Sequence, residues 1–188
     1  TSELYDGKKG IKVIPCYYKK DYPEWSDRGD GPGAPVAIHQ PNSPVIATGK
    51  RDGSKIRLPN GNYLEETASY FVMVETATGG FTPALITMKS TQLNVSKKWN
   101  SMMKTTQFPD GKGGFATPPM FGVVYNLAST LQKNDKGSWY GWVVTMDRIL
   151  GQEDKSLYLG AKDFGANVSK GAVQTKSDVE EKSDSTPY

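Results

Sequence analysis

The chain has 188 residues, of which 36% are hydrophobic and 23% are charged, and its formal net charge at neutral pH is +3. This length is sufficient for one domain with a substantial core, and 20 glycines with 12 prolines indicate many turns rather than long helices. A single cysteine, Cys16, excludes an internal disulfide, and no apolar run approaches the ~18 residues of a membrane span. We therefore expect a soluble protein of a reducing compartment, without a signal peptide or a membrane span.

Five segments have the composition of β-strands. They are residues 11–18, 70–75, 84–89, 121–131 and 138–150. The second and third are predicted to form one hairpin and the last two another, because short turn-rich segments join them. After the first strand, residues 19–35 are rich in Gly, Pro and Asp, and we expect a loop without regular structure there. Short apolar pieces follow at residues 36–39 and 45–48, and the sequence does not indicate how they pair.

Two segments have helical periodicity. Residues 91–104 place four apolar side chains on one side, with Ser90 or Thr91 as a cap, and these are Val95, Trp99, Met102 and Met103. A second helix is predicted after Asp154, with Gly171 as its stop and two internal glycines that weaken it. Its apolar positions are Leu157, Ala161, Phe164 and Val168.

These elements predict a mainly β fold. Two hairpins, a helix between the third and fourth strands and long loops are typical of an OB-like, partly open antiparallel barrel with one or two short helices. An elaborated sandwich would satisfy the same pattern, and the sequence does not separate the two architectures.

The residues that enzymes use most are scarce. His39 is the only histidine and Cys16 the only cysteine, so a zinc cluster and a histidine-assisted nucleophile lack their usual members. The phosphate-binding Gly-x-x-x-x-Gly-Lys-Ser/Thr loop is absent. We interpret His39 as an ordinary residue at a strand end, and we expect no catalysis, no metal site and no cofactor.

Aromatic residues interleaved with basic residues are the more informative pattern. Binding of a single nucleic-acid strand requires cations along the phosphates and flat side chains on which bases stack. Tyr17, Trp25 and Trp139 are the candidate stacking residues, whereas Trp99 fits better in the core. The candidate phosphate contacts are Lys19, Lys20, Arg51, Arg57, Lys97, Lys98, Lys133 and Lys136.

Strand alternation supports the choice of Trp139. In the last predicted strand, one face carries four apolar side chains that we assign to the core, namely Tyr140, Trp142, Val144 and Met146. Trp139 lies on the opposite face and is expected to be exposed.

Charge is divided unevenly between the body and the end of the chain. From residue 178 onward four acids stand against one lysine, so this segment carries −3 and the rest of the chain +6. The segment ends in Pro187 and Tyr188. An acidic peptide next to a basic surface can compete with a polyanion for that surface, and its terminal aromatic can contact a partner protein.

The body and tail together resemble the single-stranded DNA-binding proteins of bacteriophages and bacteria, in which an OB-fold body carries an acidic tail with an aromatic end. The ending Thr186-Pro187-Tyr188 is similar to the Pro-Phe endings of that group, although tyrosine replaces phenylalanine and Lys182 interrupts the acids. Residues 84–103 and 134–142 resemble segments of phage proteins. The resemblance implies a nucleic-acid-binding domain at residues 1–175 and a partner-binding tail at 176–188. The tail residues concerned are Asp178, Glu180, Glu181, Asp184, Pro187 and Tyr188.

We therefore expect a non-catalytic protein that coats single-stranded DNA, with little sequence preference, during phage replication or recombination in the cytoplasm of the bacterial host. The tail would compete with DNA and recruit a polymerase, helicase or primase. The alternative is a virion structural protein, such as a capsid-decorating or tail component, because strands joined by Gly/Pro loops suit that class equally well.

Overall fold

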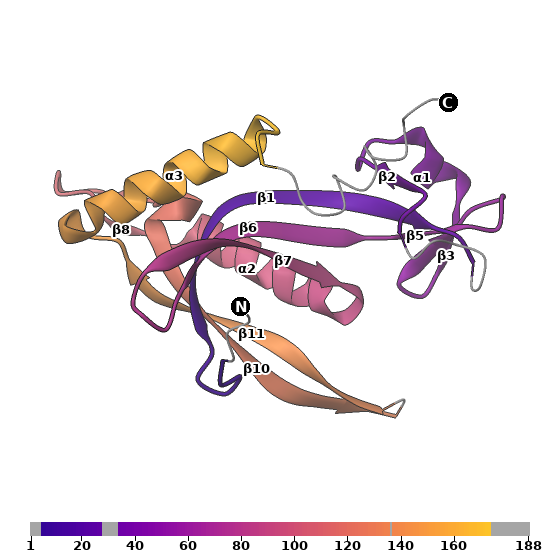
Figure 1. Cartoon of the computed structure of the whole chain (residues 1–188), viewed down its shortest axis with the longest axis horizontal. Helices are drawn as coiled ribbons and strands as arrows, with labels where there is room; N and C mark the ends of the chain where they lie inside the picture. Colours follow the sequence, from indigo (N-terminus) through magenta and orange to yellow (C-terminus); the bar gives the residue numbers. More distant parts are fainter. Residues whose placement is uncertain (1–4, 28–33, 136, 174–188) are drawn as a thin grey trace.

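The computed structural model describes residues 5–27, 34–135 and 137–173. It is mainly β, with three α-helices in the described part, and its main sheet is curled into a half-open barrel (Figure 1). The predicted fold class is therefore confirmed. The acidic tail and Lys136 lie outside the described residues.

Five antiparallel strands form the main sheet, in the order β11-β10-β1-β6-β7. Their bounds are β1 Ile11–Trp25, β6 Thr67–Glu75, β7 Phe81–Lys89, β10 Val123–Asn134 and β11 Gly137–Ile149. The two predicted hairpins are present as β6–β7 and β10–β11. Strands β1, β6 and β7 form a meander, a helix follows it, and the first strand of the next hairpin, β10, pairs with β1. Within the described residues β7 and β11 do not pair, so the barrel stays open along this seam.

The second half of β1 is the center of a smaller sheet. There β1 pairs on one side with β2 and on the other with β5, which continues through β4 to β3. The bounds are β2 Ala37–His39, β3 Lys50–Asp52, β4 Lys55–Arg57 and β5 Tyr63–Glu65. Helix α1, Pro44–Thr48, contributes Val45 and Ile46 to the apolar cluster of this sheet.

The predicted loop at residues 19–35 is therefore wrong for its first part. Residues 19–25 belong to β1, because β6 and then β2 and β5 supply partners for their backbone groups. Pairing with distant strands overrides the local turn composition. The apolar piece at 45–48 is helical, and Pro44 starts that helix, where its missing N–H costs nothing.

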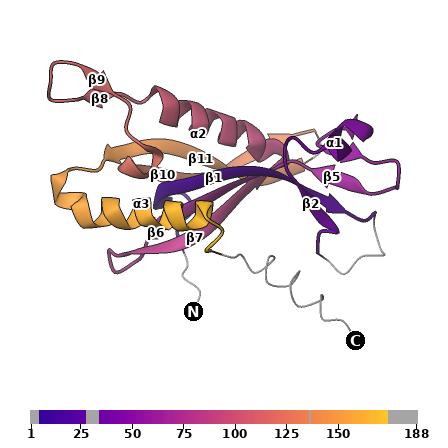
Figure 2. The same cartoon turned by 90° about the horizontal axis from the view of Figure 1, so that it is seen from above.

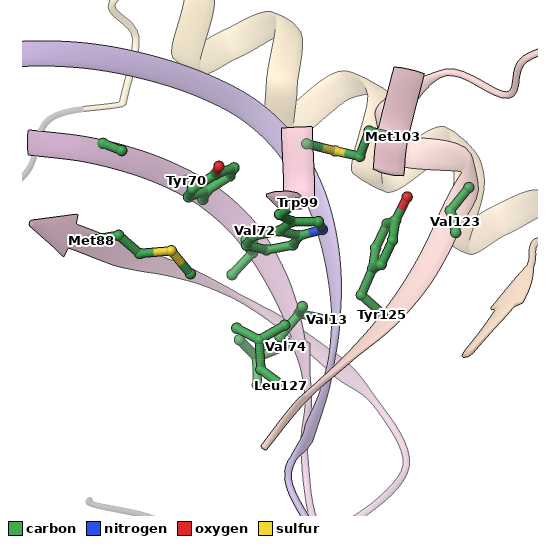
Figure 3. Packing of buried hydrophobic residues seen from close by; sticks show 11 residues of the cluster. Val13, Tyr70, Val72, Val74, Met88, Trp99, Met103, Val123, Tyr125 and Leu127 are labelled. Carbon is green, nitrogen blue, oxygen red and sulfur yellow. The ribbon is translucent and has the colours of Figure 1, made fainter. Parts of the chain in front are cut away.

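Helix α2, Leu93–Thr105, fills the inside of the curled sheet and confirms the predicted helix. Trp99 is fully buried and its ring is stacked on Tyr70 at a centroid distance of 4.3 Å, with Tyr125 at its edge (Figure 3). The predicted cap is wrong, since no side chain caps this helix. Instead the 3-10 turn η1, Ser90–Gln92, leads directly into it.

Helix α3, Lys155–Ser169, covers the outer side of the sheet, opposite α2 (Figure 2). Its Ala161 packs with Ile14 and Cys16 of β1. Gly171, with φ +71°, follows the helix end as predicted. The remaining short elements are β8 Phe108–Pro109, β9 Phe115–Ala116, η2 Met120–Gly122 and η3 Gln152–Asp154. None of the described helices is long and apolar enough to cross a membrane.

The predicted faces of β11 need correction. Trp142 and Val144 pack against the core, but Tyr140 is 73% exposed, Met146 is 45% exposed and Trp139 is half-buried. The distal half of the β10–β11 hairpin projects from the body, so the face that is buried near Trp142 reaches solvent at Tyr140 (Figure 1). Alternation identifies a shared face but not where the core ends.

Candidate nucleic-acid interface

The outer side of the sheet is covered by α3 only along part of β1. Figure 1 shows β1 continuing past the end of α3 toward the small sheet. Strand register places aromatic, basic, polar and apolar side chains on this side together with the acids Asp21, Asp52 and Glu65, and we call the non-acidic set the open face. Its residues are Tyr17, Lys19, Trp25, Lys50, Lys55, Arg57, Tyr63, Leu85, Thr87 and Lys89.

The small sheet contributes a row of directly opposed residues across four strands. The row runs from Trp25 of β1 through Tyr63 and Arg57 to Lys50 of β3. Opposed residues in neighboring strands project to the same face, so two aromatic rings lie beside two cations. Lys55 also lies over Tyr63, with its Nζ atom 3.6 Å from the ring centroid.

The main sheet continues this surface. Tyr17 is opposite Phe71, which is opposite Leu85, and the Tyr17 and Phe71 ring centroids are 6.1 Å apart. At the end of β7, the Nζ atom of Lys89 is 6.0 Å from the ring centroid of Trp25. Lys89 thereby links the main sheet to the row on the small sheet.

Several cations of the open face already have carboxylate partners. Lys19 lies 3.0 Å from Asp21, Lys89 lies 2.9 Å from Glu65, and Arg57 contacts Asp27 at 3.1 Å. A phosphate would have to compete with these carboxylates, which weakens the net attraction. Across the described ranges, Lys50 and Lys55 have no carboxylate within 4.0 Å, so they are the most available cations of this surface.

The guanidinium of Arg57 donates hydrogen bonds to the carboxylates of Asp27 and Asp52. Its pKa is raised above the ordinary value, mainly by the hydrogen bond to Asp27. Arg57 remains charged at all physiological pH values in any case. It is therefore held over the small sheet as a permanent cation.

The structure separates the predicted contact residues into three groups. Tyr17, Lys19, Trp25 and Arg57 share the open face, and Trp25 and Tyr17 are half-buried there. The second group lies elsewhere. Lys20 and Arg51 are on the core side of their strands, and Lys97 and Lys98 are exposed on α2. Lys133 and Trp139 are on the β10–β11 hairpin. Lys136 and the tail residues Asp178, Glu180, Glu181, Asp184, Pro187 and Tyr188 lie outside the described residues.

A polar cluster around the buried carboxylate of Glu24 connects the parts of the small sheet. One oxygen of Glu24 accepts hydrogen bonds from the amides of Asn60 and Asn62 at 3.1 and 2.6 Å, and the other lies 2.7 Å from Nε2 of His39. The Asn62 amide is the main reason that the pKa of Glu24 lies below its ordinary value. The cluster ties β1, β2 and the turn before β5 together, and the next residue of β1 is Trp25. His39, the last residue of β2, thus lies at a strand end as predicted and contributes to this cluster.

A comparison with protein families gives a match over residues 1–174 to the Pam3 phage gp34-like protein family. The chain belongs to this family. It is therefore a phage protein, as the sequence resemblance indicated. Neither the curated proteins nor the solved structures contain a match to the chain.

Sequence reasoning missed six open-face residues of this phage protein, namely Lys50, Lys55, Tyr63, Leu85, Thr87 and Lys89. A signal was present in the two short segments Lys55–Arg57 and Tyr63–Glu65. Each has a central apolar residue between polar ones, and a Pro-Asn-Gly turn separates them. This alternation is typical of a hairpin with one buried face. Ile56 and Leu64 are indeed buried, while their neighbors project outward.

The described residues offer little for metal chemistry. Within residues 5–27, 34–135 and 137–173, no group of three or more His, Cys, Asp or Glu side chains is placed to hold a metal ion. The thiol of Cys16 is buried, and this burial raises its pKa to about 12. It is consequently protonated and unsuited to nucleophilic or ligand roles.

Proposed function

We propose that this phage protein binds single-stranded DNA along the open face and coats it, with little sequence preference, during phage DNA replication or recombination. The observation that supports this most is the row of Trp25, Tyr63, Arg57 and Lys50 across four strands. It combines flat rings for stacking with cations for phosphates on one surface.

Two physical properties of the open-face rings support binding of a single strand with little sequence preference. Stacking of a base on an aromatic side chain contributes about 1–3 kcal/mol and does not depend strongly on base identity. Half-buried rings such as Tyr17 and Trp25 lose little freedom when a base covers them, since packing already restricts them. Rings and point charges read no base edges, so little sequence preference is expected.

The place of the open face within the fold also supports the proposal. OB-like barrels bind oligonucleotides over their second and third strands and over the loops after the first and fourth. In this chain the second and third strands of the meander are β6 and β7, and the small sheet is inserted after β1. This is an analogy of fold, and the residues above carry the chemical argument.

A titration with oligo(dT), followed by tryptophan fluorescence at low and high salt, tests the proposal. We expect quenching at low salt and an affinity that falls as salt rises, because bound phosphates release counterions. The double variant K50E/K55E should lower the affinity about tenfold or more, since it reverses the two cations without carboxylate partners.

The matched control is K97E/K98E, which makes the same charge change on exposed lysines of α2, on the other side of the sheet. It should change the affinity far less. Absence of quenching at any salt, or an equal loss for both double variants, would contradict binding along the open face.

A second candidate function is supported by the projecting hairpin. Leu131 and Tyr140 are directly opposed on β10 and β11 and are 63% and 73% exposed. Exposed apolar pairs on an arm suit a contact within an assembly, such as a capsid-decorating or tail component. Co-purification of the protein with intact phage particles, lost in a Leu131→Ser/Tyr140→Ser variant, would favor this virion role over DNA coating.

The proposed DNA coating also implies the absence of catalysis, the place of action and a role for the acidic tail. A coating protein needs no catalytic group and no cofactor, and it acts where phage DNA is copied, in the host cytoplasm. The acidic tail would recruit a polymerase, helicase or primase once DNA displaces it from the basic body. Pull-down of host and phage replication proteins with the full chain and with a chain lacking residues 178–188 tests that recruitment.

A further inference from the structure

A pocket of about 340 Å³ lies at the open seam of the barrel, between the end of β7 and the start of β11. Its size is within the range of small-ligand sites, and barrel mouths are common places for them. The lining residues are Ser90, Thr91, Asn134, Gly137, Ser138 and Trp139. The pocket is adjacent to the open face, because Ser90 directly follows Lys89.

The backbone at this pocket is strained. Ser90 has φ +52°, and within the described ranges no other residue except glycine has a positive φ. That conformation is strained for a residue with a side chain, and residues strained in this way cluster at functional sites. The turn is held from the other side, since the Gln92 side-chain oxygen accepts a hydrogen bond from the backbone N–H of Trp142 at 3.0 Å.

The chemistry of the lining selects among ligands. The described lining residues contribute three hydroxyls, one amide and one indole, and none of them carries a charged side chain. Among these described side chains a phosphate or a metal ion would find no compensating charge, whereas a flat heteroaromatic ring with hydrogen-bonding edges meets both a ring and polar groups. Trp139 is half-buried, so its ring is held in place by the surrounding residues.

We propose that this pocket receives one unstacked nucleobase of the bound strand, with Trp139 against the base and Lys89 beside the phosphate of the same nucleotide. The inference deepens the proposed function and rests on it for the strand. The hydroxyls of Ser90, Thr91 and Ser138 rotate and both donate and accept hydrogen bonds. The pocket therefore accepts any base, which agrees with binding of little sequence preference.

The first test compares oligo(dT) with an abasic deoxyribose-phosphate strand of the same length. In Ser138→Leu a larger apolar side chain fills the pocket from an exposed strand position. This variant should bind oligo(dT) about tenfold more weakly, as expected for one lost stack, and bind the abasic strand like the wild type. Thr145→Leu, at another exposed position of β11 outside the pocket, should leave both affinities unchanged. An equal loss on both strands in Ser138→Leu would overturn the base pocket.

The second test separates this inference from the proposed function. Thymidine is titrated at millimolar concentration while the indole N–H resonance of Trp139, identified by its absence in Trp139→Phe, is followed by NMR. A saturable shift that Ser138→Leu removes supports the pocket even if the chain binds no oligonucleotide and the proposed function fails. If oligo(dT) binds along the open face but the Trp139 resonance does not move with thymidine, the pocket inference is wrong and the proposed function stands.

Discussion

At the scale of single residues, Glu24 and Trp25 show how one strand serves two purposes. Successive side chains of β1 point to opposite faces, so Glu24 is buried within the polar cluster while Trp25 reaches the open face. The cluster keeps the small sheet in register, and the register keeps Tyr63 beside Trp25. A polar residue that contacts no ligand therefore positions the ring that is proposed to stack.

This arrangement predicts a specific pH dependence of stability. The pKa of Glu24 is lowered in the folded protein relative to 4.5 for an unperturbed Glu, so its stabilizing effect is complete above that value. It is lost as the pH falls through the folded pKa. The free energy of unfolding of the wild type, measured by urea denaturation, should therefore fall more steeply below about pH 4.5 than that of Glu24→Gln.

The substitution should also destabilize the protein at pH 7 by about 2 kcal/mol, because the introduced amide cannot accept from Asn60, Asn62 and His39 together. Glu153→Gln is the control, since Glu153 is exposed. Parallel pH curves for the wild type and Glu24→Gln would show that the cluster does not act through this carboxylate.

At the scale of elements, the two glycines of α3 illustrate opposite roles. A Cβ atom on Gly165 would collide with the carbonyl oxygen of Cys16, where the helix crosses β1, whereas a Cβ on Gly160 would meet open space. Gly165→Ala should thus destabilize the protein by more than about 1 kcal/mol, and Gly160→Ala should stabilize it by about 0.5–1 kcal/mol. Thermal unfolding of the two variants checks this, and equal midpoints would mean that the helix does not approach β1 this closely.

The elements that the sequence predicted correctly are those with local periodicity. Both hairpins and both long helices have a regular spacing of apolar residues, which is a local signal. The extension of β1 to Trp25 and the small sheet depend on partners that lie far away in the chain, such as Lys20 opposite Ala68. Composition at residues 19–35 favors turns, and only the distant strands decide otherwise.

The candidate site was predictable only in part for the same reason. Tyr17, Lys19, Trp25 and Arg57 were selected from aromatic and basic content, and the fold places them on one face. The same criterion selected Lys97 and Lys98, which lie on the other side of the sheet. Residue type indicates which chemistry is present, whereas strand register determines which residues meet.

At the scale of the whole molecule, the half-open barrel and the distribution of charge belong together. The shared strand β1 joins the main sheet to the small sheet, and the open face follows it from Tyr17 to Trp25. Lys50 and Lys55 lie at the far end of this path. The body carries the positive charge of the chain, and the segment from residue 178 carries −3.

This separation of charge predicts that the tail weakens DNA binding. Removing residues 178–188 should raise the affinity for oligo(dT) several-fold at low salt, because an acidic peptide near a basic surface competes with phosphates for the same cations. A chain in which Asp178, Glu180, Glu181 and Asp184 become Asn or Gln should behave like the shortened one, which assigns the effect to charge rather than to length. Raising the salt concentration should shrink the difference between the three proteins, since screening weakens the competition as well as the binding. Unchanged or weaker binding by the shortened chain would show that the tail does not reach the open face.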